Sequence, residues 1–70
     1  MFKKSKMDRE FMMGRIKNDM DYYKSKADAC WELAMREDDM RIRDSYIRLH
    51  NDYTRCYLDM WEIYLQLKNM

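Results

Sequence analysis

Apolar residues recur at alternating steps of three and four in two long runs, and this pattern constrains the fold more than any other feature of the chain. Such spacing places each run along one face of an α-helix, so each run predicts a long amphipathic helix. The first run consists of Met13, Ile16, Met20, Tyr23, Ala27, Cys30 and Ala34, and the second of Ile42, Tyr46, Leu49, Tyr53, Cys56, Met60, Ile63 and Leu67.

The two runs are out of phase across the polar segment 36–39. Ala34 and Ile42 are eight residues apart where the heptad pattern requires seven. Asp38 or Asp39 can cap a second helix, while Arg36 suits the C-terminal end of the first. The expected fold is all-α, an antiparallel two-helix hairpin with its turn near residues 36–39. A single long helix in a parallel coiled coil is the alternative, because no glycine marks the end of the first helix.

The position of this turn also predicts which residues face each other. Across a turn centred on Asp38, paired residues have numbers that sum to 76. Small residues near the turn then face large ones, an alternation that lets two helices approach closely. The predicted layers pair Ala34 with Ile42, Cys30 with Tyr46, Ala27 with Leu49, Tyr23 with Tyr53, Met20 with Cys56, Ile16 with Met60 and Met13 with Ile63.

Turn-forming residues are scarce, since the chain contains no proline and one glycine, Gly14. Gly14 lies off the apolar run, so we expect an exposed helical glycine that costs about 1 kcal/mol against alanine. A bend at Gly14, which would give three helices, is the alternative. Ser5 and Asp8 have the spacing of a capping box, so the first helix is expected to open just after Ser5. Residues 1–5 are then a basic, flexible N-terminus, and residues 6–70 form a single helical-hairpin domain.

The chain has 70 residues, close to the size at which a single core becomes marginal. One seam between two helices buries too little apolar surface to offset the conformational entropy that is lost when both become ordered. We therefore expect the hairpin to be completed to a four-helix bundle, either by dimerisation or by a partner protein.

The second helix is expected to carry another apolar stripe, roughly 130–150° around its axis from the first. Its C-terminal half is therefore apolar over more than half of its circumference, as in helices that are buried on two sides. Tryptophan and tyrosine are the side chains that most often anchor protein interfaces, so we expect this surface to bind a partner. The expected partner-binding residues are Trp31, Met35, Ile47, Tyr57, Leu58, Trp61, Tyr64 and Leu65.

The chain offers few groups for catalysis. It contains one histidine, no glycine-rich phosphate loop and no nucleophile elbow, so we expect no enzymatic activity, no catalytic residue and no cofactor. Cys30 falls in the first apolar run, where a thiol acts as a small hydrophobic group. Met20, Cys56 and Met60 offer soft ligands for Cu(I) in neighbouring layers. Methionine more often fills gaps between helices, so no metal site is expected.

The expected function is that of a small non-enzymatic protein-protein interaction module, an adaptor or inhibitor, and its small size suggests a phage or mobile-element origin. The partner is another protein, a second copy of the chain, or both. A dimeric RNA- or DNA-binding hairpin is the alternative, because arginines repeat every seven residues on the second helix. Aspartates interleave with them, and the net charge of +1 weakens attraction to phosphate. The arginines are Arg41, Arg48 and Arg55, and the aspartates are Asp44, Asp52 and Asp59.

The sequence also predicts where the protein is found. No apolar run approaches the length of a membrane span, and the basic start is not followed by the apolar segment of a secretory signal. Two cysteines without such a signal suggest reduced thiols rather than a disulfide framework. We therefore expect a cytoplasmic protein that does not interact with a membrane.

Overall fold

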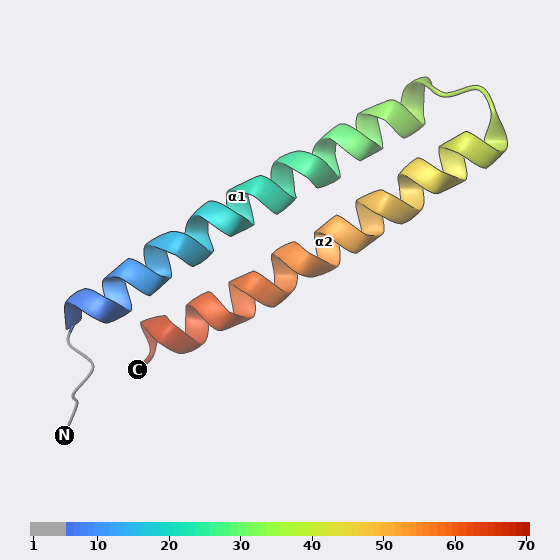
Figure 1. The fold of residues 1–70 in the computed structure, drawn as a ribbon. Coiled ribbons are helices and arrows are strands. Elements are labelled where there is room, and N and C mark those ends of the chain that lie inside the picture. The colour runs from blue at the N-terminus through green and yellow to red at the C-terminus, as the bar shows by residue number, and fades with distance from the viewer. Residues whose placement is uncertain (1–5) are drawn as a thin grey trace.

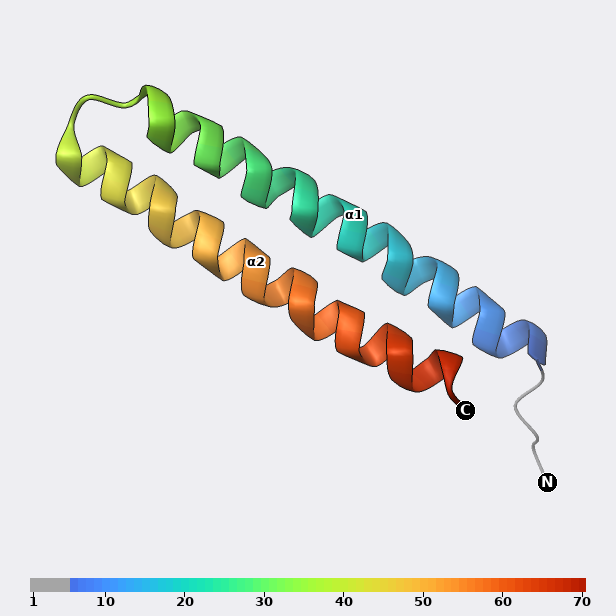
Figure 2. The ribbon, with the colours of Figure 1, turned by 180° about the vertical axis from the view of Figure 1, so that it is seen from behind.

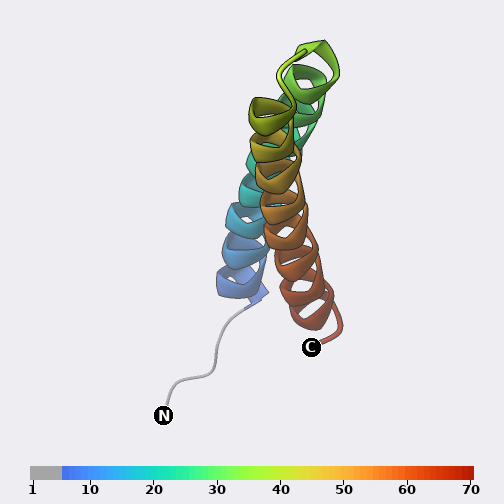
Figure 3. The same cartoon turned by 90° about the vertical axis from the view of Figure 1, so that its right-hand side faces the viewer.

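The computed structural model describes residues 6–70, with side chains from residue 8 onward, and this part of the chain is a hairpin of two α-helices (Figure 1). Helix α1 spans Lys6–Arg36 and helix α2 spans Met40–Lys68. The helices run antiparallel side by side, as the view from behind also shows (Figure 2). Seen from the side, they are inclined to each other (Figure 3). This arrangement confirms the predicted all-helical hairpin with its turn near residues 36–39, and the single long helix is wrong.

Helix α1 continues through Gly14 without interruption, so the predicted alternative of three helices is wrong. A Cβ atom added at Gly14 would meet nothing within 4 Å. An exposed glycine costs a helix only about 1 kcal/mol. Gly14 therefore does not break α1, which packs on α2 both before and after this position in the sequence. The predicted cap at Ser5 and the flexible segment 1–5 lie outside the described residues.

Two polar interactions close the turn. The Asp39 carboxylate accepts hydrogen bonds from the backbone N–H groups of Arg41 at 2.9 Å and Ile42 at 3.3 Å, which makes Asp39 the N-cap of α2. The guanidinium of Arg43 donates to the carbonyl oxygen of Glu37 from Nε at 3.2 Å and from a terminal nitrogen at 3.1 Å. The Arg43 contact therefore ties α2 to the C-terminal end of α1, where backbone carbonyls lack helical partners.

The core of the hairpin lies along one face of α1. Every position of the first predicted apolar run is buried or half-buried, which confirms that run as the inner face of α1. The side chains are small near the turn, and Ala34 is completely buried. The buried apolar residues of the described chain are Met20, Ala27, Cys30 and Ala34 in α1 and Leu67 in α2.

The prediction for the inner face of α2 is wrong at three positions. Ile42, Leu49 and Ile63 were predicted to lie in the core, but they are 44%, 45% and 40% exposed. The half-buried positions of α2 instead include Arg43, His50, Tyr57 and Tyr64, with Tyr46, Tyr53 and Met60 beside them. Helix α2 is therefore rotated about its own axis by roughly 50° from the predicted orientation.

Hydrogen bonds from α2 to α1 and to the turn account for this rotation. His50 Nδ1 lies 2.8 Å from the carbonyl oxygen of Ala27, and Arg43 reaches the Glu37 carbonyl oxygen from the same side of α2. Ala27 leaves room for the imidazole ring because its own side chain is small. The predicted layer of Tyr23 and Tyr53 is confirmed, with ring centroids 6.4 Å apart. The predicted layers of Ile42, Leu49 and Ile63 are wrong, because these side chains are exposed.

Candidate protein-interaction surface

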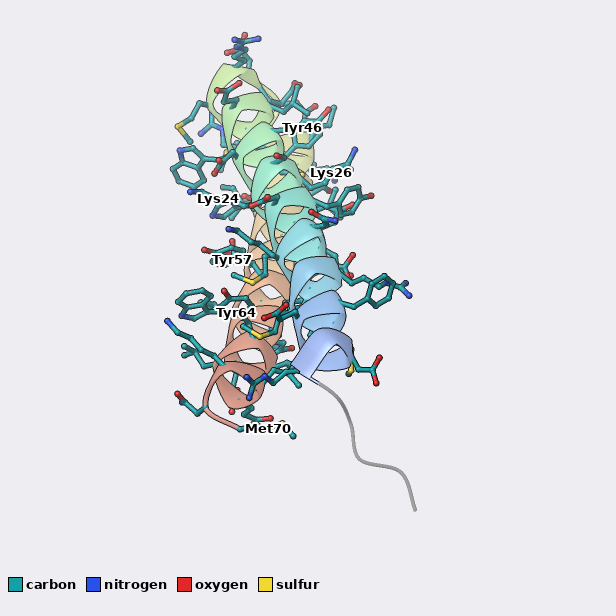
Figure 4. All side chains as sticks on the ribbon, turned by 90° about the vertical axis from the view of Figure 1, so that its left-hand side faces the viewer. Lys24, Lys26, Tyr46, Tyr57, Tyr64 and Met70 are labelled. Atoms are coloured by element: carbon teal, nitrogen blue, oxygen red, sulfur yellow. The ribbon has the colours of Figure 1, made fainter. Side chains whose placement is uncertain are left out.

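A shallow cavity marks one flank of the hairpin, where an edge of α1 meets an edge of α2. Its volume is about 180 Å³, and it is lined by Lys24, Ala27, Asp28, Thr54 and Tyr57. Figure 4 shows Lys24, Tyr57 and Tyr64 on this flank and Lys26 and Tyr46 on the opposite one. Residues seven apart lie on the same side of a helix. The exposed residues of each helix can therefore be assigned to one flank or the other by steps of seven from the residues named above.

Exposed apolar side chains follow the edges of the cavity, and we call this surface the tryptophan face. Trp31 lies one heptad beyond Lys24 and Trp61 one heptad beyond Thr54, so both indoles belong to the cavity flank. Leu58 and Leu65 adjoin Trp61 on consecutive turns of α2. The exposed apolar residues of the tryptophan face are Trp31, Met35, Leu58, Trp61 and Leu65.

Trp61 is the centre of the apolar cluster at the open end of the hairpin. Its indole lies flat against the ring of Tyr64, with centroids 5.6 Å apart and planes 6° from parallel. Tyr64 is half-buried, while Trp61 is 42% exposed. The stacking restricts the rotamers of Trp61, so the indole is presented to solvent in one orientation.

A second apolar cluster lies toward the turn. The ring of Trp31 is 5.2 Å from that of His50, whose Nδ1 is bonded to the Ala27 carbonyl oxygen. Met35 is 57% exposed one turn further along α1. The tryptophan face thus has one cluster near each end and a cavity with polar edges between them.

The eight predicted partner-binding residues fall into two groups. Trp31, Met35, Leu58, Trp61 and Leu65 are exposed on the tryptophan face, whereas Ile47, Tyr57 and Tyr64 are half-buried beneath it. The prediction did not include the cavity, because its edges are formed by polar residues such as Lys24, Asp28 and Thr54. The small residues Ala27 and Thr54, which both line the cavity, are the sequence signal that indicates a hollow.

The opposite flank carries exposed apolar side chains that we did not predict there, and we call it the aliphatic face. Leu33 lies one heptad after Lys26 on α1, and Met12 lies two heptads before it. Ile42, Leu49 and Ile63 occupy one heptad column of α2, next to the column of Tyr46. Cys56 belongs to the same column and is half-buried with a free thiol. The aliphatic face consists of Met12, Leu33, Ile42, Leu49 and Ile63, all exposed, with Cys56 among them.

Three further features of the described residues concern metal ions, membranes and nucleic acids. Within residues 6–70, no group of three or more His, Cys, Asp or Glu side chains is arranged to hold a metal ion. Neither α1 nor α2 has an apolar stretch that is long enough to cross a membrane. On the outer side of α2, the column of Arg41, Arg48 and Arg55 is exposed, and exposed aspartates flank it at positions 44, 52 and 59.

Comparison with known proteins adds no information on function. No protein-family model, no curated protein and no solved structure matches this chain. The two apolar faces of the hairpin, and the residues that arrange them, are therefore the features that bear on its function.

Proposed function

We propose that this protein is a non-enzymatic interaction module that binds an amphipathic helix of another protein on the tryptophan face. The observation that carries the proposal is the presentation of Trp61, which is exposed yet held flat on Tyr64 between Leu58 and Leu65. Tryptophan is one of the residues most enriched among the side chains that carry binding energy at protein interfaces. A side chain that is already fixed loses less conformational entropy on binding, which favours affinity.

The shape of the tryptophan face supports a helix as the bound element. The cavity volume of about 180 Å³ is below the range of pockets for small molecules, which starts near 300 Å³, and it suits one apolar side chain. The ring of Trp31 packs on that of His50, so the two clusters lie about 16 Å apart along α2, or about three helical turns. A partner helix with apolar residues at i, i+4 and i+11 would contact one cluster, the cavity and the other cluster.

We also propose that the hairpin works as part of a four-helix bundle in the cytoplasm. The small number of buried apolar residues, with Leu67 the one on α2, supports further burial of α2 by other helices. The free thiols of Cys30 and Cys56 support a reducing compartment.

A photo-crosslinking experiment in the source cells tests the proposed binding surface. A photoreactive phenylalanine derivative at position 58 lies on the tryptophan face, and the same residue at position 55, on the outer side of α2, is the matched control. We expect one discrete protein adduct from position 58, lost when Trp61→Glu is added, and no such adduct from position 55. Equal adducts from both positions would contradict the proposal.

The purified protein also tests the alternative class. We expect its absorbance ratio at 260 and 280 nm to be that of protein alone. A high ratio that nuclease treatment lowers would favour the RNA- or DNA-binding hairpin, with Arg41, Arg48 and Arg55 as the first residues to mutate.

A further inference from the structure

The aliphatic face combines apolar and charged residues in a symmetrical order. On α2, Ile42, Leu49, Cys56 and Ile63 form one column in steps of seven. On the same side of α1, the column reads Met12, Asp19, Lys26 and Leu33, also in steps of seven and with each residue exposed. Each column thus begins and ends with an apolar residue, and the centre of the α1 column holds one acid and one base.

We propose that the aliphatic face binds a second copy of this chain, related by a two-fold axis perpendicular to the helices. This axis stacks α2 on the α2 of the second copy in antiparallel orientation, and α1 on the second α1. Ile42 then meets Ile63 of the second copy, and Leu49 meets Cys56 of the second copy. The result is a four-helix bundle whose interface is separate from the tryptophan face.

The charges on α1 support this arrangement. The same two-fold axis places Met12 against Leu33 of the second copy and Asp19 against Lys26 of the second copy. Two pairs of opposite charge therefore form across the interface, one for each copy. Within one chain Asp19 and Lys26 are seven residues apart, about 10 Å along the helix, which is too far for them to form this pair.

The two columns are also centred at the same level along the hairpin, as a single two-fold axis requires. The α2 column is centred between residues 52 and 53, and the α1 column between residues 22 and 23. Tyr23 and Tyr53 lie next to these centres, and their rings are in contact with centroids 6.4 Å apart. One axis at this level therefore pairs the residues of both helices at once.

The other two-fold arrangement is less favourable. An axis parallel to the helices would stack α1 of one copy on α2 of the other. Asp19 would then face Cys56 and Lys26 would face Leu49, so neither charge would meet an opposite charge, and Lys26 would keep only its contact with the Tyr22 ring. The charged pair thus favours the antiparallel dimer over the parallel one.

The size of the aliphatic face fits a stable dimer. Two helices of about 30 residues, each about 45 Å long and about 10 Å wide, present a flank on the order of 900 Å². A standard protein interface buries about 800 Å² on each partner. The face is therefore large enough to accommodate such an interface.

Sedimentation velocity of the purified chain tests the dimer. We expect the wild type to sediment with twice the 8.9 kDa mass of one chain. Leu49→Glu should weaken dimerisation by roughly 100-fold or more, because both copies carry the buried carboxylate. Leu58→Glu is the matched control, since Leu58 is an exposed leucine of the same helix on the tryptophan face, and it should leave the dimer intact. A monomeric wild type, or a dimer that only Leu58→Glu disrupts, would overturn the proposal.

Charge exchange at residues 19 and 26 tests the orientation and avoids the risk that Leu49→Glu unfolds the hairpin. Asp19→Lys or Lys26→Asp alone places like charges across the interface and should weaken the dimer by about tenfold. The variant with both exchanges restores opposite charges and should dimerise like the wild type. If neither single exchange weakens the dimer, or if the double exchange does not restore it, the antiparallel pairing is wrong.

Discussion

His50 is the residue that most directly sets how α2 faces α1. Its Nδ1 lies 2.8 Å from the Ala27 carbonyl oxygen, and its ring packs on Trp31. Because a carbonyl oxygen only accepts, Nδ1 must carry the proton and donate the hydrogen bond. The same side chain thus fixes the rotation of α2 and supports an indole of the tryptophan face.

His50→Ala should therefore lower the free energy of unfolding by about 1–3 kcal/mol, from the lost hydrogen bond and the lost ring contact. Urea unfolding followed by circular dichroism measures this change. His50→Gln, which keeps a donor, is expected to retain part of the stability. An unchanged unfolding midpoint for His50→Ala would mean that another contact sets the rotation of α2.

Gly14 offers a stabilising substitution. The position has helical backbone without positive φ, and an added Cβ meets nothing within 4 Å. Gly14→Ala should raise the stability by about 1 kcal/mol, or the melting temperature by about 4–8 °C, as measured by thermal unfolding. A lower melting temperature would contradict the open environment of this position.

Asp39 is the most important single residue for the start of α2. Its carboxylate satisfies the N–H groups of Arg41 and Ile42, which otherwise lack helical partners. Asp39→Ala should cost about 1 kcal/mol in urea unfolding, whereas Asp39→Asn should cost less because the amide oxygen still accepts. Asp38→Ala, one residue away in the same turn, is the control and should change little. Equal losses for both alanine variants would contradict the capping assignment.

The two helices differ in how much of their packing was predictable. The heptad run of α1 identified its inner face, and Ala34 within that run is completely buried. Helix α2 carries apolar residues on three neighbouring columns, and spacing alone does not say which one faces α1. Arg43 and His50 were not part of the predicted inner face, although both are half-buried and their polar atoms reach the carbonyl oxygens of Glu37 and Ala27.

The residues of the two apolar faces were likewise only partly predictable from hydrophobic spacing. Trp61 and Leu58 could be placed on an exposed face because charged residues border the second apolar stripe of α2 on its outer side. The aliphatic face could not be predicted, since Ile42, Leu49 and Ile63 fit a core pattern equally well. Hydrogen bonds between particular atoms decide between these orientations, and such bonds are not encoded in hydrophobic periodicity.

At the scale of the whole molecule, the positions of the two cysteines determine whether a disulfide can form within one chain. Cys30 is buried and Cys56 is half-buried, and both are free thiols. Cys30 is level with residue 47 of α2, so about 13 Å of helix separates it from Cys56, beyond the range of a disulfide. We expect mass spectrometry to find no intramolecular disulfide in the native protein.

Alkylation of the folded protein should modify Cys56 faster than Cys30, because Cys56 is the more exposed thiol. If the second copy covers the aliphatic face, the reaction of Cys56 should slow as protein concentration rises, and Leu49→Glu should remove that protection. A rate that does not depend on concentration, in a range where the chain is dimeric, would place the dimer interface elsewhere.

Tyr53 connects the hairpin seam with the assembly of the whole molecule. Its ring packs on Tyr23 at the middle of the seam, next to the centre of the aliphatic face. Tyr53→Asp removes the ring pair and places a carboxylate in a half-buried position, so it should lower the stability by at least about 2 kcal/mol. Circular dichroism should show a loss of helix at temperatures where the wild type is folded.

Two variants serve as controls for Tyr53→Asp. Tyr53→Phe keeps the ring, and Arg55→Asp adds a carboxylate on the outer side of α2, so both should stay within about 0.5 kcal/mol of the wild type. If Tyr53→Asp melts like the wild type, the pairing of α1 with α2 through this layer is wrong.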